Sequence, residues 1–101
     1  MNVTYNYQHV SGSKELESYT AEKLQTIFDR YDWVTRAHVF YRLENTSSPD
    51  SGKIVEIRLS APGNQLFSEE SHASFHGSIN KVVDQLKKQC EKRKADLLKH
   101  L

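Results

Sequence analysis

The stretch SAPGNQLFSEESHASF, which runs from Ser60 to Phe75, links two different sequence periodicities. Before it, Val55–Leu59 alternates apolar and polar residues, as a strand does. Pro62-Gly63 then favours the centre of a type II turn, because proline fixes φ and glycine accepts positive φ. Leu66–Ser71 therefore predicts a short strand that pairs back as a hairpin, directly before a helix begins.

This helix is predicted to start near Ser74 and to have one apolar side and one basic side. Its apolar residues recur at helical spacing and define the side that faces the core. They are Phe75, Ile79, Val82, Val83, Leu86, Cys90 and Leu97. The opposite side carries Lys81, Lys88, Lys92 and Lys99. Lysines on a rigid helix can contact successive phosphates of a nucleic acid without reading its sequence.

The first half of the chain predicts two more strands and a second amphipathic helix. Residues 2–8 alternate apolar and polar side chains, which is typical of a half-buried strand. A helix follows over about residues 13–31, with Ser13 as its N-cap. Residues 35–43 return to a period of two, and Glu44–Gly52 has the composition of a loop.

The order β-α-β-β-β-α predicts an α+β domain built as a two-layer sandwich. We expect a four-stranded, mostly antiparallel sheet with both helices on one face. The other face should meet solvent, because its side chains are charged. They are Arg36, His38, Arg42, Glu56 and Arg58. Phe40 is the only aromatic residue that we place there, which argues against a platform for stacking bases.

Composition is that of one ordinary globular domain. The chain has 101 residues, of which 37% are hydrophobic and 27% charged. No apolar run is long enough for a membrane span, and the first residues lack a signal peptide's apolar region. We therefore expect a cytoplasmic protein without a membrane partner. The single cysteine, Cys90, is predicted to be a small buried side chain rather than a catalytic thiol.

The net charge of +1 conceals a split between the body and the last helix. Residues 1–80 hold 7 Lys and Arg against 10 Asp and Glu, whereas residues 81–101 hold 7 against 3. A basic helix on a mildly acidic body fits an anionic partner, but it also fits a solvated, lysine-rich surface. Charge alone leaves both interpretations open.

Motifs of catalysis and metal binding are missing from the sequence. No phosphate-binding glycine loop and no nucleophile elbow occurs. His72 and His76 lie four residues apart, but no further ligands have the spacing of a metal site. Glu69 and Glu70 are neighbours on a strand, so they point to opposite faces and cannot share a catalytic site. We expect no enzyme, no metal, no cofactor and no small-molecule substrate.

Two segments carry a family resemblance through the order and spacing of their motifs. In VEIRLSAPGNQLFSEESHASFHGSINKVVDQLKKQCEKRK (55–94), a strand ends in a proline-containing turn and an L-x-x-E strand follows. Its helix has the form I-x-x-x-V-D-x-L-x-x-Q-x-x-K-x-K, at Ile79, Val83, Asp84, Leu86, Gln89, Lys92 and Lys94. ESYTAEKLQTIFDRY (17–31) is similar to the family's first helix. The chain thus resembles the ribosome hibernation-promoting factors and ribosome-associated translation inhibitors, formerly called sigma-54 modulation proteins.

The resemblance implies a double-stranded-RNA-binding-like fold and a partner, the small ribosomal subunit with its RNA and neighbouring proteins. It implies binding where tRNA and mRNA sit, and inhibition of translation in stationary phase or stress. Long family members add a dimerisation domain. Here we expect a single ribosome-binding domain over residues 1–101 and no C-terminal dimerisation domain. The implied RNA-binding residues are basic positions of both helices: Lys23, Arg30, Lys81, Lys87, Lys88, Lys92 and Arg93.

An alternative function remains open from the sequence. The basic C-terminal helix could belong to a protein-interaction module that docks an acidic, non-ribosomal partner or self-associates. Both interpretations use the C-terminal helix and differ in the chemistry of the partner.

Overall fold

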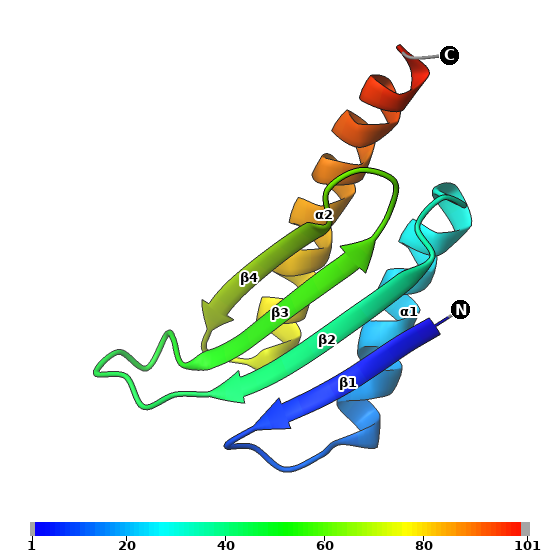
Figure 1. The fold of residues 1–101 in the computed structure, drawn as a ribbon. Helices are drawn as coiled ribbons and strands as arrows, with labels where there is room; N and C mark the ends of the chain where they lie inside the picture. The colour runs from blue at the N-terminus through cyan, green and yellow to red at the C-terminus, as the bar shows by residue number, and fades with distance from the viewer. Residues whose placement is uncertain (1, 100–101) are drawn as a thin grey trace.

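A computed structural model describes residues 2–99 and gives the predicted order of elements. They are β1 (Asn2–Gln8), α1 (Lys14–Arg30), β2 (Arg36–Leu43), β3 (Lys53–Ser60), β4 (Leu66–His72) and α2 (Phe75–Leu98). Figure 1 shows the strands as one layer and both helices behind the same sheet face. The predicted two-layer α+β sandwich is therefore confirmed. Within the described range, neither helix combines the length and the apolar character that crossing a membrane requires.

The sheet is mixed, with spatial order β1-β2-β3-β4. β1 pairs with β2 in parallel, which requires a crossover connection, and α1 supplies it. β2, β3 and β4 pair antiparallel, as expected for a mostly antiparallel sheet. α2 then runs back behind β3 and β4 and extends past the end of the sheet (Figure 1).

Local signals fix the ends of the helices and of the hairpin. The side chain of Ser13 accepts a hydrogen bond from the Leu16 amide at 3.1 Å, and Ser74 accepts one from the Gly77 amide at 3.0 Å. Each serine thereby satisfies one of the amide groups that a helix start leaves free. Gly63 has a φ of 88°, which confirms the positive φ expected in the β3–β4 turn.

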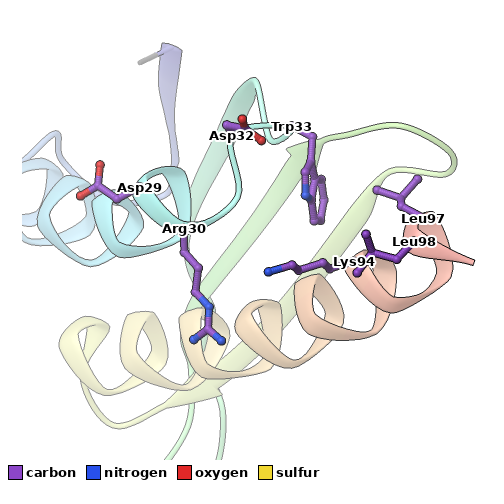
Figure 2. Close-up of a pocket in the computed structure, with 7 residues that line it drawn as sticks. All are labelled: Asp29, Arg30, Asp32, Trp33, Lys94, Leu97 and Leu98. Carbon is purple, nitrogen blue, oxygen red and sulfur yellow. The ribbon is translucent and has the colours of Figure 1, made fainter. Parts of the chain in front are cut away.

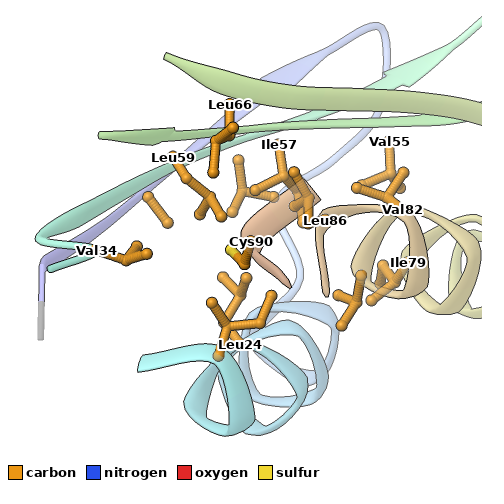
Figure 3. Packing of buried hydrophobic residues seen from close by; sticks show 14 of the residues in the cluster. Leu24, Val34, Val55, Ile57, Leu59, Leu66, Ile79, Val82, Leu86 and Cys90 are labelled. Atoms are coloured by element: carbon orange, nitrogen blue, oxygen red, sulfur yellow. The ribbon is translucent and has the colours of Figure 1, made fainter. Parts of the chain in front are cut away.

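The core lies between the sheet and the two helices. Cys90 of α2 is fully buried, as predicted, and Figure 3 shows it between Leu59 of the sheet and Leu24 of α1. Burial raises the pKa of the Cys90 thiol to about 11, because an apolar surrounding disfavours the thiolate.

Tyr41 joins three parts of the core. Its hydroxyl lies 2.6 Å from Thr20 Oγ1 of α1, although the ring is fully buried. The ring stacks on Tyr7 of β1 at a centroid distance of 5.0 Å, and Phe75 of α2 meets it edge-on at 6.1 Å. One residue of β2 thus contacts β1, α1 and α2.

The open face of the sheet differs from the sequence-based prediction in one residue. Phe67 is directly opposite Arg58 in the β3–β4 ladder, so it shares the open face with Phe40. It is 59% exposed. The expectation that Phe40 is the only aromatic residue on this face is therefore wrong. Leu66 and Phe67 are adjacent apolar residues, and the structure buries Leu66 in the core, so the alternation of the strand turns Phe67 outward.

Replacing Tyr41 by phenylalanine should lower the free energy of unfolding by about 1 kcal/mol. The change removes the buried contact of the Tyr41 hydroxyl with Thr20 and its longer bond, at 3.3 Å, to the Leu16 carbonyl, while Thr20 keeps its own bond to that carbonyl. Urea denaturation measures the difference. Tyr19→Phe is the matched control, because its hydroxyl bonds Asn80 at an exposed site. Equal effects of both substitutions would contradict a special role for Tyr41.

Cys90 should not react with a thiol-specific reagent at about pH 8 while the protein is folded. The buried thiol stays protonated there, because its pKa is raised to about 11. Adding denaturant should release the chain's only thiol for full reaction. Rapid labelling of the native protein would show that α2 detaches from the sheet easily.

Candidate nucleic-acid interface

The two helices lie side by side and run in the same direction (Figure 1). Three side-chain pairs span the seam between them, and each pair joins residues 61 positions apart. They are Glu15–His76 at 2.8 Å, Tyr19–Asn80 at 2.9 Å and Arg30–Glu91 at 3.9 Å. The constant offset means that α1 and α2 keep one register along the whole seam, and both helix N-termini lie at the same end.

Three of the predicted RNA-binding residues border this seam, and we call them the seam cations: Lys23, Arg30 and Lys87. Lys23 Nζ lies 5.3 Å from the centroid of the Tyr19 ring. Arg30 approaches Glu91 only loosely and keeps 65% of its side chain exposed. Lys87 lies four residues before Glu91 and therefore on the same side of α2.

The outer lysine row, Lys81, Lys88 and Lys92, lies on a different side of α2. All three residues are exposed, which confirms that they face away from the core. At 100° per residue they point away from α1. The charge of Lys81 helps to lower the pKa of Glu70, so this end of the row lies near β4. Lys81 and Lys92 are about 16 Å apart along the helix axis.

Arg93 is engaged within the fold. Its Nη1 donates hydrogen bonds to the carbonyl oxygens of Pro62 at 2.5 Å and Asn64 at 2.8 Å. The guanidinium thereby ties the β3–β4 turn to α2. An RNA contact by Arg93 stays a prediction, whereas its hydrogen bonds to the β3–β4 turn are present in the structure.

A polar network anchors α2 beside β4, beneath the outer lysine row. Glu70 Oε1 lies 2.8 Å from His72 Nε2, and Glu70 Oε2 accepts a hydrogen bond from Gln85 Nε2 at 2.8 Å. The bond with His72, followed by that with Gln85, lowers the pKa of Glu70. Glu69 points to the open face and bonds Arg42 at 2.7 Å. The two carboxylates therefore occupy opposite faces, as predicted.

A cleft of about 480 Å³ opens where α2 extends past the end of α1. Figure 2 shows Trp33 pointing toward the last turns of α2, with Leu97 and Leu98 beside it. Asp29, Arg30, Asp32 and Lys94 form the charged part of its lining. The cleft thus combines an apolar wall with charged side chains of both signs.

The two histidines considered for a metal site bond different partners. His72 bonds Glu70 on its own strand, and His76 bonds Glu15 across the helix seam. Over residues 2–99, no cluster of three or more potential metal ligands is found.

Comparison with known proteins adds an independent observation. The sequence model of the family described as "Sigma 54 modulation protein / S30EA ribosomal protein" matches residues 3–97. The chain belongs to this family. The resemblance carried by the two helices and the proline turn is therefore confirmed.

Two kinds of relatives accompany this family assignment. A ribosome hibernation promoting factor of Pseudomonas putida is 28% identical over 94 residues, covering 93% of this chain and 87% of that protein. A ribosomal subunit interface protein from Coxiella burnetii superposes with a TM-score of 0.80 at 22% identity, covering 94% of this chain and 99% of that one. The N-terminal domain of Thermus thermophilus Protein Y gives 0.75 at 22% identity, covering 91% and 98%. These structural likenesses show that the fold is shared.

Glu70 makes the stability of the protein depend on pH in one direction. Its pKa in the folded state is lowered, so the ionised carboxylate contributes to the free energy of unfolding. This contribution is fully present above the ordinary carboxylate pKa and is lost as the pH falls through the lowered, folded-state pKa. Wild type should therefore exceed Glu70→Gln in stability at about pH 7, and the difference should be smaller at about pH 3. Urea midpoints at both pH values measure this.

Glu22→Gln provides the control for this experiment, because Glu22 is an exposed carboxylate on α1. Its effect should be small at both pH values. A difference between wild type and Glu70→Gln that stayed constant down to about pH 3 would contradict the role of the carboxylate charge.

Proposed function

We propose that this chain is a ribosome hibernation factor that binds the small ribosomal subunit at the decoding region and inhibits translation in stationary phase or stress. The family match over residues 3–97 carries this proposal. The name of the P. putida relative, a ribosome hibernation promoting factor, points to the same process. The name of the C. burnetii structure, a ribosomal subunit interface protein, points to the partner.

The distribution of cations supports a contact with RNA through the helical layer. The outer lysine row and the seam cations all lie on the helices, on the side of the molecule opposite the open sheet face. Residues 81–101 carry seven basic against three acidic residues. Lysine–phosphate contacts need little geometric precision, so a rigid helix with exposed lysines suits an irregular RNA surface.

The mechanism that we propose is occlusion. The folded domain measures 48 × 25 × 18 Å and is held together by a continuous core. When its helical layer contacts the ribosomal RNA, the body of the domain occupies the space of tRNA and mRNA. This function needs binding and rigidity but no chemical step, which fits a non-enzymatic, cytoplasmic protein without cofactor.

Co-sedimentation with purified bacterial small subunits tests the proposal. Wild-type protein should pellet at low salt and dissociate at high salt, because the released counterions drive binding to phosphates. Replacing Lys81, Lys88 and Lys92 by glutamate should weaken binding by at least about tenfold. It should also lower the slope of log affinity against log salt by about 3, one unit for each lost phosphate contact.

The matched control replaces three cations that lie outside the outer lysine row, the seam cations and the open-face cluster, namely Lys14, Arg42 and Lys53, also by glutamate. It changes the net charge equally and should bind far better than the first variant. Equal binding by both variants would contradict the outer lysine row as the contact. Failure of the wild-type protein to pellet at low salt would refute the ribosomal partner. Pelleting that survives RNase treatment of a complex from cell extract would favour a protein-interaction module.

A further inference from the structure

Three planar side chains from three adjacent strands meet on the open face of the sheet. Phe40 of β2, Arg58 of β3 and Phe67 of β4 form what we call the open-face cluster. Arg58 and Phe67 are directly opposite each other in the β3–β4 ladder. Phe40 is opposite Glu56, two residues before Arg58, and so lies one diagonal step from Arg58. The cluster faces away from the helices and the outer lysine row.

Arg58 lies at the centre of this cluster and is held by two contacts. Its guanidinium carbon lies 4.9 Å from the centroid of the Phe40 ring, and its Nε lies 2.5 Å from Glu56 Oε2. These two contacts hold the guanidinium beside the Phe40 ring. Because 46% of the side chain remains exposed, part of the guanidinium is accessible to a planar ligand. Fixing the plane in advance lowers the entropic cost of stacking a ligand on it.

Phe67 extends this surface. At 59% it is more exposed than any other large hydrophobic residue in the described part of the chain. Its backbone is held in place, because its carbonyl accepts a hydrogen bond from Gln89 of α2 at 2.8 Å. An aromatic ring on an ordered strand, next to an ordered guanidinium, has the composition of a base-stacking platform.

The charges around the cluster favour an anionic ligand. On the side nearer the β3–β4 turn, the open face carries Arg36, and His38 lies directly opposite Arg58. The carboxylates of this face, Glu56 and Glu69, lie on the other side and are bonded to Arg58 and Arg42. A ligand whose flat part covers the cluster could therefore direct its negative charge toward Arg36 and His38.

We propose that the open-face cluster binds an unpaired base of single-stranded RNA. The base stacks on the Arg58 guanidinium and the Phe67 ring, and the adjoining phosphate lies toward Arg36 and His38. This site is separate from the helical layer and gives the domain RNA contacts on both of its faces. Every nucleobase has a flat π surface, so the site needs no particular sequence.

Fluorescence anisotropy with a labelled oligouridylate tests this site in the isolated protein. Phe67→Ala should raise the dissociation constant about tenfold, because it removes one stacking surface. Arg58→Lys should have a similar effect, since it keeps the charge and loses the plane. Leu43→Ala is the control: Leu43 is 38% exposed, at the end of β2, and its removal should leave the affinity within about twofold.

An abasic oligomer of the same length separates stacking from attraction by charge. It should bind wild type as weakly as oligouridylate binds Phe67→Ala. In NMR spectra, the Arg58 Nε–H signal should shift when oligouridylate is added and not when the abasic oligomer is added. Equal affinity of wild type for both oligomers, or of Phe67→Ala and wild type for oligouridylate, would overturn the proposal.

The two RNA-binding proposals can fail separately. Binding of oligouridylate through the cluster requires no ribosome, and subunit binding through the outer lysine row requires no single strand. Both sites are supported if the lysine variant no longer pellets with subunits and Phe67→Ala binds oligouridylate more weakly than wild type. If only one of these two effects is observed, the proposal behind the other effect is wrong.

Discussion

The buried hydrogen bond between Tyr41 and Thr20 sets the distance between the sheet and α1. A hydroxyl left unpaired at this depth would cost about 1–3 kcal/mol, so the two elements can pack at only one height and rotation. The same tyrosine ring meets Phe75 at the start of α2. Tyr41 therefore contacts both helices, and these contacts help to place α1 and α2 side by side along the seam.

The seam contacts extend this internal constraint to the surface of the helical layer. Because three contacts keep the same offset of 61 residues, neither helix can slide without breaking all of them. The backbone positions of the seam cations and of the outer lysine row are thus fixed relative to one another. A fixed backbone lowers the entropic cost of binding an RNA surface, and this suits a protein whose proposed function is to stay bound.

Much of the fold could be predicted from the sequence, because its signals are local. The serines before each helix, the alternation of the strands and Pro62-Gly63 each act within a few residues. The site was less predictable. The exposure of Lys88 follows from helical periodicity, but the hydrogen bonds of Arg93 join residues 31 and 29 positions away. The face of Phe67 depends on which residue begins β4, and a single-residue change there inverts it.

β1 has a consequence for the way the native state opens. None of its residues is fully buried, and it is joined to the sheet only along β2. Tyr5 and Tyr7 tie it to α1 through hydroxyl contacts with Glu17 and Ser13. Its amides should exchange with solvent before those of the core strands. Detachment of β1 would leave β2 as an unpaired edge strand that can pair with a strand of another molecule. By holding β1 in place, the hydroxyl contacts of Tyr5 and Tyr7 therefore also oppose aggregation.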